Sequence, residues 1–193
     1  MDTWIPVLKL LVSFAVGAIP FAVVAVWGTG IDITKAGSGN PGFNNVWRVS
    51  SFGRGLFTLV GDLSKSAVAI AVLASSGDPA WFEWAVGLAA VAGHCWTPFL
   101  RFNGGKGVAT MAGALLFLEP RIAGPSLLLY PTLRVFGRRM GWAQEGAISS
   151  MTTMSVIAAA VFWLRGPGAG FFALAGLAIV VVRHIPNIRQ ILS

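Results

Sequence analysis

Two polar, glycine-rich stretches interrupt an otherwise apolar chain of 193 residues. The first covers residues 36–48, with the sequence AGSGNPGFNNVWR, and the second covers residues 102–110, with the sequence FNGGKGVAT. Glycine allows successive backbone N–H groups to converge on an anion, and a lysine or arginine nearby supplies the opposite charge. These stretches are therefore the places where the chain could bind a phosphate group.

The first stretch holds Ser38 and Asn40 among closely spaced glycines, and Arg48 follows them. This composition predicts N–H donors around a hydroxyl and an amide, which would make a phosphate cradle; an ordinary interfacial turn has the same composition. Arg48 favours phosphate binding, because a guanidinium can hold a phosphate through two parallel hydrogen bonds.

The second stretch contains Gly104, Gly105 and Lys106 but is not a nucleotide-binding P-loop. The glycine spacing before the lysine differs, and no serine or threonine follows it. We expect a helix to begin here, so free N–H groups and the helix dipole would join Lys106 in favouring an anion. The alternative is a lysine retained in a flexible turn on the cytoplasmic side.

The two histidines lie in different settings. His94 follows an apolar run, and a lone histidine in such a place is more often a hydrogen-bonded structural residue. His184 lies beside Arg183 and close to Asn187, where it can reach the membrane interface. We therefore expect His184, more than His94, to contact a ligand.

Asp62 and Lys65 lie three residues apart inside an apolar run. Charge is costly there unless it is paired or faces a polar cavity, so we expect a structural ion pair that also shapes the site. Several catalytic motifs are missing: no histidine is followed by aspartate five residues later, and neither Gly-x-Ser-x-Gly nor His-Glu-x-x-His occurs. A histidine general base held by a carboxylate is therefore not expected.

The composition indicates an all-α, polytopic transmembrane bundle that forms one integral membrane domain over residues 1–193. Hydrophobic residues make up 55% of the chain and charged residues 11%, and the mean hydropathy is +0.75. The net charge of +7 fits membrane orientation and anionic lipids or substrates better than nucleic acid, because no basic run is interleaved with aromatics. One cysteine excludes an intrachain disulfide, and two distant histidines make a zinc site improbable.

About seven spans are expected, and the first is too long for a cleavable signal. The apolar runs cover residues 4–27, 54–75, 82–101, 106–118, 121–137, 146–165 and 168–184. Residues 28–52 read as one long connecting loop. Most lysines and arginines fall in alternate connections and the C-terminal tail, which predicts an outside N-terminus and a cytoplasmic C-terminus. Both glycine-rich stretches and the tail would then share the cytoplasmic face and build one site.

Three motifs, in order, resemble the bacterial acyl-phosphate:glycerol-3-phosphate acyltransferase family. The first is Gly17-Ala-Ile-Pro-Phe21 leading through Asp32 to residues 37–48; the second joins residues 93–98 to 102–110; the third is RHIPNIR at residues 183–189. Asp62 and Lys65 also fit the second span of this family. The resemblance covers nearly the whole chain.

The resemblance implies transfer of a fatty acyl group from acyl phosphate to the 1-hydroxyl of glycerol 3-phosphate. The products would be lysophosphatidic acid and phosphate, in the first acylation step of phospholipid biosynthesis. The resemblance also implies that the reaction would need no metal or coenzyme and that the substrate's own phosphate would accept the proton, which fits the missing protein base. The enzyme would be a multi-pass protein of the bacterial plasma (inner) membrane, in contact with membrane lipid, with its active site facing the cytoplasm.

The resemblance also implies a role for each candidate residue. The phosphates would be held by Ser38, Arg48 and Lys106, assisted by backbone N–H groups of Gly39, Gly104 and Gly105. The loop or the glycerol hydroxyls would be fixed by Asn40 and Asn45, and glycerol 3-phosphate would be oriented by His184 and Asn187. Ser149 or Ser150 would line the same cavity.

The chain departs from the family pattern at a few positions, which keeps two alternatives open. Family members usually carry alanine and threonine at Phe43 and Asn44, an arginine near Thr34, and glycine and glutamate after the third motif, where this chain has its last residues up to Ser193. These differences suit a diverged paralogue with altered substrate or lost activity. A small anion or lipid transporter is the rival from another class, although the inverted repeats of such transporters are absent from the sequence.

Overall fold

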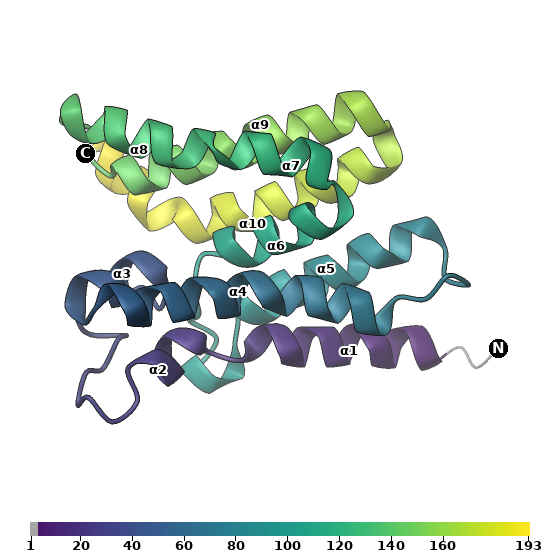
Figure 1. Cartoon of the computed structure of the whole chain (residues 1–193), viewed down its shortest axis with the longest axis horizontal. Coiled ribbons are helices and arrows are strands. Elements are labelled where there is room, and N and C mark those ends of the chain that lie inside the picture. The colour runs from purple at the N-terminus through teal and green to yellow at the C-terminus, as the bar shows by residue number, and fades with distance from the viewer. Residues whose placement is uncertain (1–3) are drawn as a thin grey trace. The chain divides into compact units, whose positions relative to one another are not determined.

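The computed structural model describes residues 4–193, and every regular element in that range is a helix (Figure 1). This confirms the all-α prediction. The elements are α1 (Trp4–Ala18), α2 (Phe21–Ala25), α3 (Phe43–Val49), α4 (Phe52–Leu73), α5 (Ala80–Cys95), the 3-10 helix η1 (Pro98–Leu100), α6 (Val108–Leu118), α7 (Pro120–Leu127), α8 (Leu129–Arg139), α9 (Glu145–Arg165) and α10 (Pro167–Leu192). They form two compact units, which meet in sequence between Ala114 and Leu115 within α6.

Each of the seven predicted apolar runs contains helix, but fewer of the described helices are long enough to cross a membrane. Within the described part of the chain, four helical segments are long and apolar enough to cross a membrane: Trp4–Ala25, Phe52–Leu73, Glu145–Arg165 and Pro167–Leu192. The first of these is broken near Pro20, which separates α1 from α2. Proline has no N–H to continue the helical hydrogen bonds, so the helix is interrupted there.

The prediction of one long loop over residues 28–52 is wrong in one respect, because this segment contains the helix α3. Its residue Val46 is fully buried and packs in a small apolar cluster with Ala22, Val26 and Ile33. A seven-residue helix is too short to be stable on its own propensity, so this tertiary packing stabilises it. Sequence periodicity over so few residues does not reveal such a helix.

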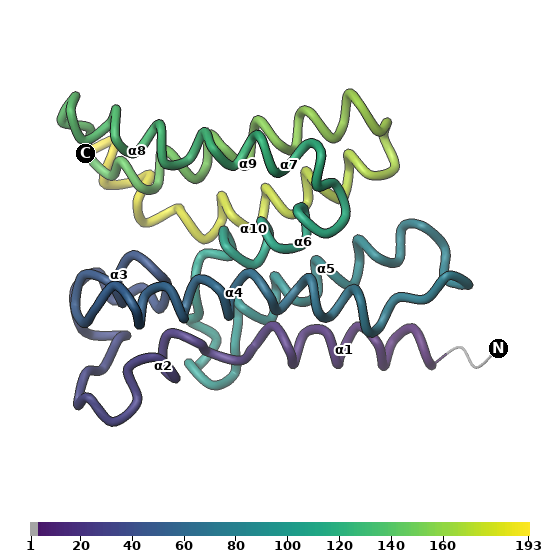
Figure 2. Tube along the Cα trace, viewed as in Figure 1, coloured from purple at the N-terminus to yellow at the C-terminus, as the bar shows by residue number. Residues whose placement is uncertain are grey.

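In the first unit, α1 packs against α5 and α4 (Figures 1 and 2). A Cβ at Gly17 would collide with the carbonyl of Ala90, so the two backbones touch there. Such small residues let helices approach closely where no hydrophobic effect drives them together. Lys9 on α1 pairs with Asp78 in the α4–α5 connection at 2.7 Å, at the end of the unit where α1 begins.

In the second unit, α9 and α10 form an antiparallel hairpin that turns at Gly166, whose φ is 83°. The ion pair between Arg165 and Glu119, at 2.7 Å, ties this turn to the start of α7. The helices α7 and α8 both pack on α9.

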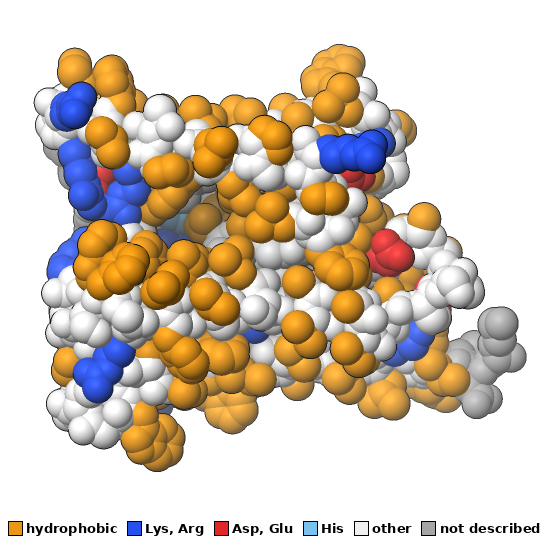
Figure 3. Space-filling view, viewed as in Figure 1, with side chains coloured by type: hydrophobic (Ala, Val, Ile, Leu, Met, Phe, Trp, Pro, Cys, Tyr) orange, Lys and Arg blue, Asp and Glu red, His pale blue; other side chains and the backbone are white. Residues whose placement is uncertain are grey.

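Large apolar side chains remain exposed along several helices. On α1 and α4 they include Trp4, Leu8, Leu11, Phe52, Phe57, Val60 and Val72. Figure 3 shows hydrophobic side chains, in orange, over much of the visible face of these helices. An extended apolar surface of this kind is stable when lipid covers it.

Candidate active site

The first glycine-rich stretch is a turn that the buried side chain of Asn45 holds together. Asn45 Oδ1 accepts a hydrogen bond from the backbone N–H of Ser38 at 2.9 Å. Asn45 Nδ2 donates to the carbonyls of Ala36 at 2.9 Å and Ile33 at 3.3 Å. Of the two roles predicted for Asn45, this geometry matches fixing the loop.

Ser38, in this braced turn, and Arg48, in the helix that follows it, are both exposed. Ser38 lies between Gly37 and Gly39, whose φ angles are 60° and 69°, and Arg48 lies in the last turn of α3. The N–H of Gly39 donates to the carbonyl of Ala36, so in this conformation it helps to close the turn. The serine hydroxyl and the guanidinium are thus the exposed polar side chains that this turn presents.

Asp32 lies four residues before this stretch and forms the turn that leads into it. Its carboxylate accepts hydrogen bonds from the hydroxyl and the N–H of Thr34 at 2.6 and 3.0 Å, and it pairs with Lys35 at 3.2 Å. The Thr34 hydroxyl, followed by Lys35, lowers the pKa of Asp32 below its ordinary value. The carboxylate therefore stays charged at neutral pH and fixes the turn that leads into the glycines.

Phe43 is the first residue of α3, and its side chain packs along this helix. Its ring lies 5.6 Å from that of Trp47, centroid to centroid, and it faces Gly55 of α4, where a Cβ would come within 3.2 Å of the ring. Its bulk is therefore accommodated by the contact between α3 and α4.

The second glycine-rich stretch folds back on the end of α5. The N–H of Gly104 donates to the carbonyl of Cys95 at 3.0 Å, and the N–H of Gly105 donates to the carbonyl of His94 at 3.2 Å. A Cβ at Gly104 would collide with the His94 carbonyl, and one at Gly105 would collide with the His94 ring at Nε2. Both positions therefore require glycine, and in this conformation they shape the loop. Lys106 is half-buried and lies just before α6, which begins at Val108, as predicted.

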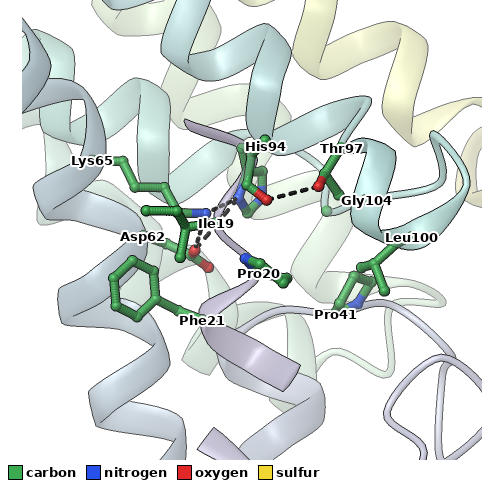
Figure 4. A pocket seen from close by; sticks show the side chains of 12 residues that line it. Ile19, Pro20, Phe21, Pro41, Asp62, Lys65, His94, Thr97, Leu100 and Gly104 are labelled. Atoms are coloured by element: carbon green, nitrogen blue, oxygen red, sulfur yellow. Dashed lines mark hydrogen bonds and ion pairs between the residues drawn. The ribbon is translucent and has the colours of Figure 1, made fainter. Parts of the chain in front are cut away.

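Asp62 and Lys65 form the predicted ion pair, and His94 joins them (Figure 4). The distance from Lys65 Nζ to Asp62 Oδ1 is 2.8 Å, and His94 Nδ1 lies 3.1 Å from Lys65 Nζ and 3.4 Å from Asp62 Oδ1. All three side chains are buried. Sequence reasoning found the pair but did not connect His94 to it.

These three residues line a small pocket at the break between α1 and α2. Pro41 of the first stretch and Gly104 and Gly105 of the second also line it, as Figure 4 shows for Pro41 and Gly104. The structure thus brings the two stretches to one pocket in the first unit. Ser38, Arg48 and Lys106 are not among its lining residues.

In the second unit, His184 of α10 is buried against α9. Its Nε2 lies 3.2 Å from the hydroxyl of Ser150, and its Nδ1 lies 2.8 Å from the carbonyl of Val180. The Ser149 hydroxyl instead donates to the carbonyl of Glu145. Of the two serines predicted to line the substrate cavity, Ser150 is the one that lies beside His184.

Asn187 lies on α10 and is held by a residue that sequence reasoning missed. Asn187 Nδ2 donates to Gln144 Oε1 at 2.7 Å, and Gln144 Nε2 donates to Gln190 Oε1 at 2.6 Å. Gln144 precedes α9 with a left-handed backbone, at φ 57°. No pattern in the sequence pointed to Gln144, because its partners are more than forty residues away.

The predicted site residues therefore fall into two groups. The first unit contains Ser38, Gly39, Asn40, Asn45, Arg48, Gly104, Gly105 and Lys106; the second contains His184 and Asn187. Within residues 4–193, no three His, Cys, Asp or Glu side chains cluster as metal ligands would.

The chain is similar to known proteins over almost its full length. Residues 7–193 match the family model described as Glycerol-3-phosphate acyltransferase. A relative named glycerol-3-phosphate acyltransferase from Rubrobacter xylanophilus is 34% identical over 96% of this chain and 91% of its own. Another of the same name, from Geobacter sulfurreducens, is 38% identical over 93% of this chain and 90% of its own.

Two solved structures have the same fold. Both are crystal structures of PlsY, described as an integral membrane glycerol 3-phosphate acyltransferase. The glycerol 3-phosphate form is 28% identical, with a TM-score of 0.86 over 97% of this chain and 92% of that one. The lysophosphatidic acid form is 29% identical, with a TM-score of 0.83 over 97% and 91%. The chain therefore belongs to the glycerol-3-phosphate acyltransferase family of integral membrane enzymes.

Proposed function

We propose that this protein transfers a fatty acyl group from acyl phosphate to the 1-hydroxyl of glycerol 3-phosphate. The observation that carries the proposal is the near full-length match to PlsY, which was crystallised in forms with glycerol 3-phosphate and with lysophosphatidic acid. These two molecules would be the acceptor substrate and the product of this reaction.

The proposed step is a direct acyl transfer. The 1-hydroxyl oxygen attacks the carbonyl carbon of acyl phosphate, the bond from that carbon to the phosphate oxygen breaks, and phosphate leaves. The hydroxyl proton passes to a phosphate oxygen of the substrate. Because acyl phosphate is already activated, the protein mainly binds two phosphates, aligns the hydroxyl and stabilises developing charge.

We assign Ser38, Arg48 and Lys106 to the phosphates. Ser38 is exposed in the turn that Asn45 braces and Arg48 is exposed on the helix that carries Asn45, which supports this role. The N–H groups of three glycines, Gly39, Gly104 and Gly105, are hydrogen-bonded within their own loops. We therefore propose that these glycines shape the binding segments, and we propose the same role for Asn40.

We assign His184 and Asn187 to glycerol 3-phosphate. Each is held by a neighbour in the second unit, His184 by Ser150 and Asn187 by Gln144. A side chain fixed in this way loses little conformational entropy when it binds a substrate.

The membrane arrangement is also part of the proposal. We place about seven spans in the bacterial inner membrane, with the N-terminus outside and the C-terminus and active site on the cytoplasmic side. The uneven distribution of lysine and arginine among the connections supports this orientation. We treat the whole chain as one functional domain, because the family model covers residues 7–193.

The decisive experiment is a phosphate-release assay with purified protein, acyl phosphate and glycerol 3-phosphate, with the lipid product followed by mass spectrometry. We expect lysophosphatidic acid and phosphate in equal amounts, and near-complete loss with Lys106→Ala or Ser38→Ala. Robust turnover by both variants would reject the site assignment. Vesicle uptake of glycerol 3-phosphate without chemistry would instead indicate a transporter, and a folded protein that binds neither substrate would indicate an inactive paralogue.

A further inference from the structure

Three ionisable side chains are buried together in the first unit, and the proposed reaction gives none of them a chemical role. Asp62 and Lys65 are each 3% exposed and His94 is 8% exposed. Lys65 Nζ forms an ion pair with Asp62 Oδ1 at 2.8 Å and lies 3.1 Å from His94 Nδ1, within hydrogen-bond distance. This cluster links α4 to the last turn of α5.

His94 then connects the cluster to the second glycine-rich stretch. Its carbonyl accepts the N–H of Gly105, and its ring leaves no space for a Cβ at that glycine. With Nδ1 facing Lys65, the Nε2 edge of the His94 ring faces Gly105. The ring position therefore limits where the backbone before Lys106 can run.

A second contact from α4 fixes the backbone on the other side of Lys106. The hydroxyl of Ser66, next to Lys65 in sequence, donates to the carbonyl of Thr110 in the first turn of α6. A Cβ at Gly113 would collide with the carbonyl of Leu63, so α6 also touches α4 directly. Lys106 thus lies between two points anchored to α4.

We propose that Asp62, Lys65 and His94 are positioning residues that set the backbone path of Gly104, Gly105 and Lys106. The functional part of this inference rests on the proposed role of Lys106 in phosphate binding. A displaced loop would carry the lysine ammonium away from its phosphate, and errors of about 1 Å in such groups can cost 10²-fold in rate.

A charge-removing swap separates positioning from stability. Replacing a buried ion pair by apolar residues of similar volume is often neutral for folding, so Asp62→Val with Lys65→Met should still fold. We expect this variant to melt near the native temperature. Its KM for glycerol 3-phosphate should rise about tenfold or more, because that is the effect of losing one charge-assisted hydrogen bond to the substrate. Native KM and kcat in a folded swap would overturn the proposal.

The matched control is a second lysine–aspartate pair of the first unit, Lys9 with Asp78. Lys9 and Asp78 pair at 2.7 Å, away from both glycine-rich stretches. Lys9→Met with Asp78→Val removes the same two charges and should leave KM and kcat within about twofold of native values. An equal rise in KM in this control would show a general effect of charge removal and would overturn the proposal.

Amide hydrogen exchange tests the positioning without substrate. The N–H groups of Gly104 and Gly105 are hydrogen-bonded, so they should exchange slowly in the native protein and at least tenfold faster in the swap. His94→Leu, which keeps the Asp62–Lys65 pair, should give the same increase if the swap does not fold. Unchanged exchange in a folded variant rejects the positioning, whereas absence of phosphate release by the native protein rejects the proposed function.

A double substitution tests the contact itself. Gly105→Ala should lower activity, because its Cβ collides with the His94 ring. Adding His94→Ala removes that ring, so the double variant should recover part of the activity that Gly105→Ala loses. An additive, deeper loss would mean that Gly105 acts independently of His94 and would contradict the proposal.

Discussion

Asn45 Oδ1 accepts the backbone N–H of Ser38 at 2.9 Å, across the turn that both residues help to form. The same side chain donates to two carbonyls of the preceding loop, so a single buried amide fixes the path of the chain from Ile33 to Ser38. A helix residue thereby fixes the backbone of an exposed serine seven positions earlier.

Asn45→Ala and Asn45→Asp test this bracing. The alanine variant leaves buried partners unpaired and should lose about 1–3 kcal/mol of unfolding free energy. The aspartate variant keeps the acceptor for Ser38 but loses both donors, so its carboxylate faces two carbonyls. We expect both variants to lower kcat/KM in the phosphate-release assay, with chemical denaturation as the stability measurement. A folded Asn45→Ala protein with native kcat/KM would contradict the bracing role.

Arg48→Lys tests whether the guanidinium binds phosphate through two bonds. Lysine keeps the charge but cannot form the parallel pair, so we expect kcat/KM to fall about tenfold or more. Arg48→Ala should fall further. Arg54, an exposed arginine in the first turn of α4, provides the control, since Arg54→Lys should have little effect. Equal activity of Arg48→Lys and native protein would remove Arg48 from the phosphate site.

Gln144→Ala tests the support of Asn187. The substitution removes the Gln144 side-chain oxygen that accepts from Asn187 Nδ2. Because Asn187 is assigned to substrate binding, we expect KM for glycerol 3-phosphate to rise more than kcat falls. Gln190→Ala removes the outer partner of Gln144 and should have a smaller effect. Steady-state kinetics with glycerol 3-phosphate varied at saturating acyl phosphate measures the difference. A larger effect at Gln190 would place the support elsewhere.

Phe43→Ala tests whether the bulky residue in the first motif restricts the reaction. The ring packs on Trp47 and Gly55, so its removal should lower the melting temperature and leave kcat within about twofold of the native value. A large gain in kcat would instead show that the ring obstructs the substrate.

The Lys9–Asp78 pair predicts a specific dependence of stability on pH. Donation by Lys9, followed by Ser75, lowers the pKa of Asp78 below its ordinary value of 3.8. A lowered pKa adds stability that is present above the ordinary value and is lost as pH falls through the lower, folded-state value. The melting temperature of Asp78→Asn should therefore lie below that of the native protein at about pH 6, and the gap should narrow as the pH falls below 3.8. A gap that stays constant would show that the charge does not contribute.

The sequence predicted the helical class and the helix positions well, because apolar runs of this length have few other structures open to them. It also predicted the Asp62–Lys65 pair, since a spacing of three residues is set by helix geometry alone. It missed α3, whose stability comes from packing of Val46, and it missed Gln144. The contact of His94 with Lys65 joins two helices, and one sequence without an alignment carries no signal for such a distant pair.

Asp62 and Lys65 lie one helical turn apart on the same helix, so their charges can neutralise each other before any tertiary contact exists. During biosynthesis, α4 can therefore enter the bilayer as an electrically balanced segment, although a lone aspartate or lysine at that depth would oppose insertion. His94 lies on α5, the next helix to be synthesised. The Asp62–Lys65 pair can therefore form before His94, the side chain that Lys65 contacts, has been made.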